Sequence, residues 1–112
     1  MKVNFSGLDR LNIPSMLDIA IPESKGPEMV IISEISDKVS MTTDEWDEYG
    51  IINDPRGFGW HPVKILKETE YELNEHQVKI LMDAAITLDE LGRVTRQNST
   101  TWMKLKELKL TK

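Results

Sequence analysis

The residue types that carry most protein chemistry are sparse in this sequence. Its 112 residues include no cysteine, and the two histidines, His61 and His76, lie far apart. A chain without cysteine has no thiol nucleophile, no disulfide and no iron–sulfur or Cys-ligated zinc site. The two imidazoles also lack the short spacing that brings two metal ligands onto one helix face. The sequence therefore predicts no metal site and no bound cofactor.

Motifs for covalent catalysis and for phosphate binding are incomplete. Ser6 precedes Gly7 but lacks the first glycine of the turn that presents a nucleophilic serine. The segment at residues 57–59 lacks the third glycine, the lysine and the strand-to-helix context of nucleotide-binding loops. With 19 acidic side chains, some pair falls at any chosen separation, so a carboxylate pair alone does not indicate a glycosidase. We therefore expect a protein that is not an enzyme.

Aromatic residues are crowded into one short segment. The sequence has seven of them, and four fall within residues 46–60. Tryptophan, tyrosine and arginine often anchor protein interfaces, and a loop rich in glycine and proline commonly displays such residues. The alternative is that the tryptophans fold inward and fill space between a helix and a sheet. Phe58, between two glycines, is the best candidate for an exposed anchor. The predicted partner-binding residues are Trp46, Tyr49, Arg56, Phe58, Trp60 and His61.

Charge is divided unevenly along the chain, whose formal net charge is −5. Residues 93–112 hold six basic side chains and one acid, a net of +5, whereas residues 1–92 carry a net of −10. A basic end attracts polyanions that an acidic body repels. The alternative is that these cations form the solvated face of a terminal helix. The candidate nucleic-acid-binding residues are Arg93, Arg96, Lys104, Lys106 and Lys109.

Residues 71–81 and 92–102 resemble parts of a winged-helix DNA-binding domain. In that family a capped helix precedes a turn rich in serine, threonine, arginine and glutamine, followed by a recognition helix. The resemblance implies side chains suited to phosphate and base-edge contacts in the turn. No second helix is evident between the pair, and the acidic body opposes a polyanion. Nucleic-acid binding is therefore kept as an alternative function.

The first third of the sequence predicts short strands separated by turns. Val3 and Phe5 alternate with polar residues, and residues 17–21 alternate in the same way. Prolines bracket the second of these segments, and a turn follows it. Residues 28–35 are rich in isoleucine, with apolar side chains on both faces, which is typical of a central strand. We expect three strands here.

Two later helices carry clear start signals. Thr42 and Glu45 form a capping box before a short helix, since each side chain can bond the backbone N–H of the other. Asn74 and Gln77 repeat this pattern before a helix of about residues 75–91, whose apolar residues recur with helical spacing. Glycines at positions 50 and 92 suit the ends of the two helices.

The remaining segments predict a loop, a strand and a final helix. Residues 53–62 hold too many prolines and glycines for regular structure. In residues 63–73, apolar or β-branched side chains alternate with charged ones, as on a half-solvated antiparallel strand. Polar residues 99–101 then precede Trp102 and Leu105, which share one helical face.

Together these patterns predict a single α+β domain over residues 1–112. We expect a mainly antiparallel sheet of three to five strands, one short helix, one amphipathic helix and a C-terminal helix.

No signal peptide or membrane-spanning stretch is evident, which favours a cytoplasmic protein with no membrane partner. The expected function is a non-catalytic protein-interaction module. It fits a small adaptor, regulator or inhibitor that binds another protein, in the style of bacterial or bacteriophage accessory proteins. Homo-oligomeric assembly is a second alternative use of the aromatic segment.

Overall fold

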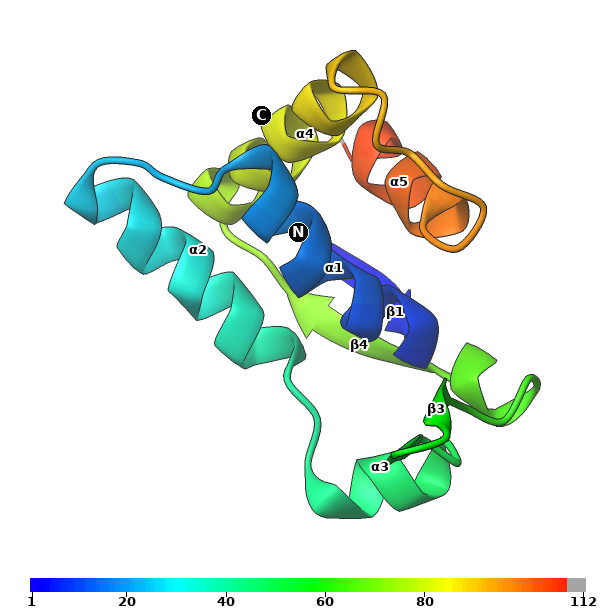
Figure 1. The fold of residues 1–112 in the computed structure, drawn as a ribbon. Coiled ribbons are helices and arrows are strands. Elements are labelled where there is room, and N and C mark those ends of the chain that lie inside the picture. Colours follow the sequence, from blue (N-terminus) through cyan, green and yellow to red (C-terminus); the bar gives the residue numbers. More distant parts are fainter. Residues whose placement is uncertain (109–112) are drawn as a thin grey trace.

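The computed structural model describes residues 1–108, which form a small α+β fold (Figure 1). The described part holds five α-helices, one 3₁₀ helix and four short strands. In chain order they are β1 (Lys2–Ser6), α1 (Gly7–Ala20), α2 (Gly26–Val39), α3 (Thr43–Glu48), β2 (Ile52–Asp54), β3 (Gly57–Gly59), η1 (Lys64–Leu66), β4 (Glu68–Glu72), α4 (Glu75–Glu90) and α5 (Ser99–Glu107).

The strands form two separate antiparallel pairs, not the single larger sheet that the sequence predicts. β1 pairs with β4, so that Lys2 lies opposite Glu72 and Ser6 opposite Glu68. One face of this two-stranded ribbon is turned toward the helices. On that face Phe5 is fully buried, and its ring centroid lies 5.7 Å from that of Tyr71. The predicted strand near residues 3–5 is confirmed. β2 and β3 form a short hairpin of their own.

Helix α1 is the central element of the fold. It packs against α2, α4, α5, β1 and η1 and lies along the β1–β4 ribbon (Figure 1). Its start is fixed by a capping box, in which Ser6 and Asp9 each bond the backbone N–H of the other. The predicted strand at residues 17–21 is wrong. Met16 and Leu17 are buried as part of this helix, because the stripe they form with Ile13 has helical spacing.

The predicted strand at residues 28–35 is also wrong, because this segment lies within α2. Pro27 stands in the first turn, where a missing N–H costs no hydrogen bond. Ile32, Ile35 and Val39 are buried at positions three and four apart, which is the spacing of one helix face. Val30, which falls on the other face, is 58% exposed. The apolar run therefore belongs to a surface helix rather than to a central strand.

Helices α3, α4 and α5 confirm the three helices that the sequence predicts. Both capping boxes are formed, with the Asn74 side chain accepting from the N–H of Gln77 at 2.9 Å. Gly92, with a φ of +65°, follows α4 in the left-handed conformation expected after a helix. The core between the helices and β1 is built from Phe5, Ile13, Met16, Leu17, Ile32, Ile35, Val39, Leu73, Val78, Ile80, Leu81, Ala84, Ala85, Leu88, Leu105 and Leu108.

Residues 41–67 form a projection that we call the hairpin lobe. It contains α3, the β2–β3 hairpin and η1, and it lies below the helical body in Figure 1. The predicted irregular loop at residues 53–62 is wrong in part, because most of the β2–β3 hairpin lies within it. The predicted strand at residues 63–73 is confirmed only in its second half, because residues 64–66 form η1 before β4 begins. Within residues 1–108, no helix is both long enough and apolar enough to cross a membrane.

Candidate functional site

A buried arginine joins the hairpin lobe to the helical body. Arg10, on α1, is only 5% exposed. Its Nε donates to the carbonyl of Val39 at 3.0 Å, and one terminal nitrogen donates to the carbonyl of Ser40 at 2.6 Å. The guanidinium also forms a two-point ion pair with Glu45 of α3, with one N–O distance of 3.0 Å. One side chain thus connects α1, the end of α2 and α3.

The ion pair holds Glu45 in its charged form. The hydrogen bond from Arg10, aided by the Thr42 backbone N–H, lowers the pKa of Glu45 to about 2. Burial alone lowers the pKa of Arg10, but its hydrogen bonds to Glu45 and Tyr49 outweigh burial and raise that pKa above its ordinary value. The guanidinium carbon also lies 5.9 Å and 5.8 Å from the ring centroids of Tyr49 and Tyr71. The positive charge of Arg10 is therefore balanced within the fold, and the residue has a structural role.

Tyr49 was predicted to contact a partner, and the structure corrects this. The residue is 1% exposed, and its hydroxyl accepts a hydrogen bond from Arg10 at 3.3 Å. Its ring packs where Gly7 begins α1: a Cβ added at Gly7 would lie 3.2 Å from a Tyr49 ring carbon and 2.9 Å from the Ile65 carbonyl. Tyr49 and Ile65 are the only buried residues of the lobe, and both serve to attach it.

Three of the predicted partner-binding rings meet on the lobe surface. The centroid of Phe58 lies 6.4 Å from that of Trp46 and 5.8 Å from that of Trp60, in edge-to-face arrangements. Phe58 is 49% exposed, and both tryptophans are partly exposed. α3 supplies one ring and the hairpin with its following residue supplies the other two. The structure thus gathers these rings into one cluster, while leaving them in contact with solvent.

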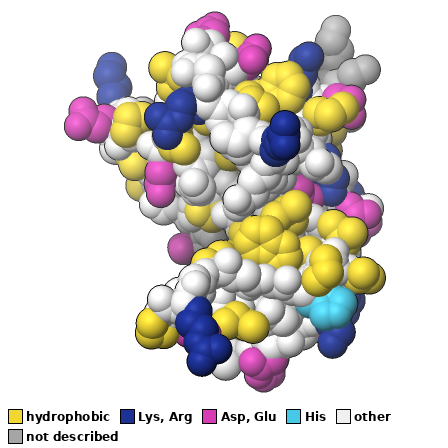
Figure 2. Space-filling model, turned by 45° about the vertical axis from the view of Figure 1, so that its right-hand side comes forward, with side chains coloured by type: hydrophobic (Ala, Val, Ile, Leu, Met, Phe, Trp, Pro, Cys, Tyr) yellow, Lys and Arg dark blue, Asp and Glu magenta, His cyan; other side chains and the backbone are white. Residues whose placement is uncertain are grey.

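The lobe carries three further exposed apolar side chains. Ile52, Val63 and Leu66 are 58%, 71% and 56% exposed, respectively. Figure 2 shows hydrophobic side chains gathered over the lower part of the molecule, where the lobe lies. We call the set Trp46, Ile52, Phe58, Trp60, Val63 and Leu66 the aromatic surface. An exposed apolar patch of this kind is typical of a binding site.

The polar residues predicted for the same site have distinct positions. Arg56 is exposed, and its backbone N–H donates to the Asp54 carboxylate at 2.8 Å within the hairpin turn. His61 is exposed, but its Nδ1 accepts from the backbone N–H groups of Val63 and Lys64, both at 3.2 Å. The imidazole therefore orders the turn that leads into η1. Arg56 alone of these two offers a side chain with no hydrogen bond to the described residues.

The basic C-terminal segment is divided between internal and exposed cations. Lys104 donates to the Asp9 carboxylate at 2.5 Å and to the Glu68 carboxylate at 2.8 Å, so it ties α5 to α1 and β4. Lys106 lies 5.0 Å from the ring centroid of Trp102. Arg93 and Arg96 are exposed. Lys109 lies outside the described residues.

Asp9 is a buried acid that sequence reasoning missed. It is 1% exposed, and its carboxylate accepts from the Ser6 N–H, from Lys104 and from the Thr101 hydroxyl, the last at 2.5 Å. Asn12, one helical turn on, donates to Thr101 and to the Gln97 carbonyl. This polar network locks α5 onto α1. The only sequence signal was the capping pair of Ser6 and Asp9.

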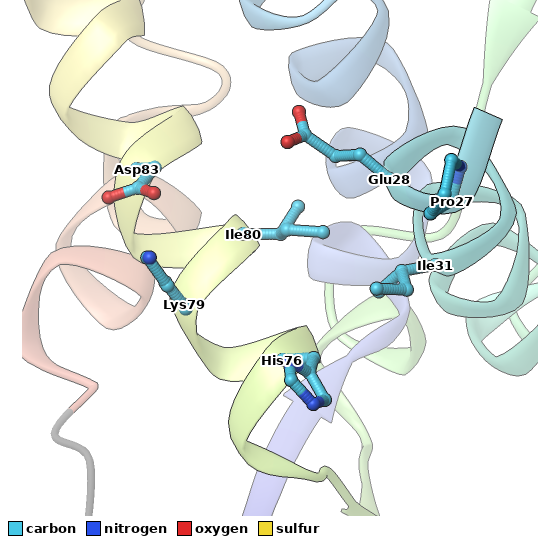
Figure 3. A pocket seen from close by; sticks show the side chains of 7 residues that line it. All are labelled: Pro27, Glu28, Ile31, His76, Lys79, Ile80 and Asp83. Atoms are coloured by element: carbon cyan, nitrogen blue, oxygen red, sulfur yellow. The ribbon is translucent and has the colours of Figure 1, made fainter. Parts of the chain in front are cut away.

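A second surface feature is a pocket of about 260 Å³ between α2 and α4 (Figure 3). Ile31 and Ile80 point toward each other across its floor, and Glu28, Lys79 and Asp83 stand around it. His76 lies at one end. None of these charged side chains forms an ion pair within residues 1–108, and opposite charges share the rim. The pocket therefore has no single charge preference.

Comparison with protein-family models, with curated proteins and with solved structures finds no match to this chain. Within residues 1–108, no three histidine or acidic side chains lie together so that they could hold a metal ion. The geometry of the lobe is thus the main basis for assigning a function.

Proposed function

We propose that this protein is a protein-interaction module that binds another protein through the aromatic surface of the hairpin lobe. The observation that carries the proposal is the cluster of Trp46, Phe58 and Trp60, in which Phe58 lies edge-to-face against both tryptophans while all three rings remain open to solvent. Aromatic side chains supply much of the binding energy at protein interfaces when a partner covers them. Such a module acts as an adaptor or regulator by binding to a surface of its partner.

The construction of the lobe supports this role. The three rings of the cluster contribute little to the interior, where Tyr49 and Ile65 are the buried residues of the lobe. The lobe is nevertheless tied to the helical body by the contacts of Arg10 with Glu45 and Tyr49 and by the close packing at Gly7. A surface that is fixed before binding loses less conformational entropy when a partner docks. Exposed rings on a lobe that is tied to the helical body are therefore better explained by recognition than by folding.

The test is affinity capture from the native host with matched variants. We expect the double variant Phe58→Ala, Trp60→Ala to lose a partner that the wild-type protein retains, while its thermal midpoint changes little. The control is Ile86→Ala, Met103→Ala, which trims two exposed apolar side chains far from the lobe, 55% and 54% exposed. This control is expected to keep the partner. A partner that both double variants retain would refute the proposed surface.

Self-association through the same surface is the competing outcome. An isologous dimer needs only one self-complementary patch, so the aromatic surface alone suits a second copy as well. Sedimentation of the purified protein separates the two cases. A dimer that the Phe58→Ala, Trp60→Ala variant converts to a monomer would replace the proposed partner by a second copy of this chain. A monomer at all accessible concentrations leaves the heterologous partner as the occupant.

A further inference from the structure

A pocket of about 190 Å³ lies between α1 and the segment that leads into α5. Asn12, Ser15 and Ile19 line it from α1, and Arg93, Thr95, Gln97 and Asn98 line it from the other side. No acidic residue lines it, although the whole chain has a net charge of −5. Its chemistry differs in this respect from that of the pocket between α2 and α4.

The wall of the pocket is fixed by hydrogen bonds. Thr95 and Asn98 bond reciprocally, with the Thr95 N–H donating to the Asn98 side chain at 2.7 Å. The Asn98 amide also donates to the Arg93 carbonyl at 3.3 Å. On the opposite wall, Asn12 is held by its contacts with Gln97 and Thr101. The cavity is therefore a feature of the folded chain and not a gap between loose loops.

One acceptor in this pocket receives no hydrogen bond from the described residues. Asn12 is 5% exposed, and its amide nitrogen uses both hydrogens, toward the Gln97 carbonyl at 3.0 Å and the Thr101 hydroxyl at 3.1 Å. Its carbonyl oxygen accepts nothing from residues 1–108. No fully enclosed side-chain oxygen or nitrogen among those residues lacks a partner. This oxygen is therefore accessible, and the pocket that Asn12 lines is where a ligand can reach it.

Several other polar groups around the pocket can donate hydrogen bonds. The Arg93 side chain is exposed and forms no ion pair with the described residues, so its guanidinium is available to an anion. The hydroxyl of Ser15 and the amide of Gln97 likewise make no hydrogen bond within the described residues. A ligand that satisfies this set carries an oxyanion for Arg93 and a hydroxyl donor for Asn12.

We infer that this pocket binds a phosphate group with a hydroxyl close by, as in a ribose phosphate. The phosphate pairs with Arg93 and with Ser15, and the hydroxyl donates to the free oxygen of Asn12. The same unit occurs in free sugar phosphates and in the backbone of RNA. This site lies away from the aromatic surface and does not depend on the proposed protein partner.

The experiment is a titration of the ¹⁵N-labelled protein, followed by amide chemical shifts. Ribose 5-phosphate is expected to shift the amide signals of Ser15, Gln97 and Asn98 in a saturable way, and ribose without phosphate is expected to bind at least about tenfold more weakly. Arg93→Gln is expected to weaken binding about tenfold. The matched control is Arg96→Gln, since Arg96 is also exposed but does not line the pocket.

Further probes show whether the phosphate and its neighbouring hydroxyl come from a free sugar phosphate or from RNA, and whether the hydroxyl contributes to binding. Saturation by a short single-stranded RNA, but not by ribose 5-phosphate, would assign the site to an RNA backbone. Inorganic phosphate binding as tightly as ribose 5-phosphate would overturn the role given to Asn12. No saturable shift with any phosphate probe, or equal binding by wild type and Arg93→Gln, would overturn the site itself.

Discussion

At the scale of single residues, the most informative side chain is Arg10. A buried cation is costly unless it is paired and hydrogen-bonded, and removing one partner of such a pair leaves the other uncompensated. Arg10 meets both conditions through Glu45 and two backbone carbonyls. Because these acceptors lie where α2 ends and α3 begins, the arginine of α1 sets the position of the hairpin lobe. Its partner Glu45 makes this arrangement sensitive to acid.

We predict an acid-dependent loss of stability centred on Glu45. The pKa of this group is lowered from 4.5 to about 2 in the folded protein, so its contribution is full above pH 4.5 and is lost as the pH falls toward 2. Because the carboxylate is 27% exposed, solvent screening limits the contribution to about 2 kcal/mol. Chemical unfolding of Glu45→Gln against wild type between pH 3 and 6 should show the difference shrinking at low pH.

The matched control for this experiment is Glu48→Gln. Glu48 also pairs with a cation, Lys67, but both side chains are exposed and such pairs contribute little. We expect its free energy of unfolding to stay within about 0.5 kcal/mol of wild type at neutral pH. A Glu45→Gln variant as stable as this control would show that the ion pair with Arg10 does not hold the lobe.

Gly7→Ala is predicted to destabilise the fold where α1 meets the lobe. The added methyl would lie 2.9 Å from the backbone carbonyl of Ile65, an atom that cannot rotate away. Overpacking of this kind costs about 1–3 kcal/mol. Gly26→Ala is the control, because a methyl there meets nothing within 4 Å. Thermal unfolding should therefore separate the two variants by several degrees, and equal midpoints would contradict the close packing.

Much of this residue-scale detail could not be predicted from the sequence. The aromatic residues are conspicuous by type, so Trp46, Phe58 and Trp60 were predicted as a group. Their exposure could not be predicted, because tryptophan suits a core as well as an interface. Tyr49 shows the difficulty, since it lies in the same segment and is buried. Arg10 was missed because its partners lie about 30 or more residues away, where no local pattern connects them.

At the scale of elements, capping signals were more reliable than hydrophobic patterns. Asn74 and Thr42 mark the starts of α4 and α3, because a capping box is formed by residues close in sequence. The run of residues 29–32 shows the opposite case. A short apolar run fits a buried strand or a helix face equally well by periodicity. Tertiary packing of Ile32 and Ile35 against the core decided in favour of α2.

The capping box of α4 can be tested directly. Asn74→Ala removes the side chain that accepts from the N–H of Gln77, and loss of such a cap costs about 1 kcal/mol. We expect a lower midpoint in chemical denaturation with an unchanged slope, since the change affects stability and not the surface exposed on unfolding. Asn53→Ala, in the exposed hairpin, is the control. An Asn74→Ala variant as stable as wild type would show that α4 does not depend on its cap.

The hairpin lobe is predicted to open more readily than the helical body. Local stability follows the density of buried apolar contacts, and the lobe contributes only Tyr49 and Ile65 to the interior. Native-state hydrogen exchange should therefore show the amides of β2 and β3 exchanging at a lower opening free energy than those of α4. Equal protection in the two regions would mean that the lobe and body unfold as one unit.

At the scale of the whole molecule, the lobe makes the shape elongated. The Cα radius of gyration is 14.0 Å and the extents are 40 × 28 × 25 Å. A compact chain of this length is expected near 13 Å. Small-angle scattering of the dilute protein should match the elongated monomer. A radius that grows with concentration, and returns to the monomer value in Phe58→Ala, Trp60→Ala, would indicate pairing through the aromatic surface.

The general class of the molecule was predictable, but its sheet was not. The residue patterns and capping signals indicated a small α+β domain, and the structure agrees at that level. The single sheet of three to five strands was wrong because two of its expected strands are helical and the hairpin pairs only with itself. Strand pairing is a long-range property. The partner of β1 lies more than 60 residues away, and no local pattern in either strand indicates which strand it pairs with.

The pairing of β1 with β4 has a consequence for synthesis of the chain. On a ribosome, β1 emerges before β4 and lacks this partner until residues 68–72 follow it. Phe5 and the open edge of β1 are therefore exposed to other nascent chains during that interval. Closing so long a loop carries an entropic cost that local helices do not. We therefore expect folding to begin in the helices and to finish when the first strand is captured.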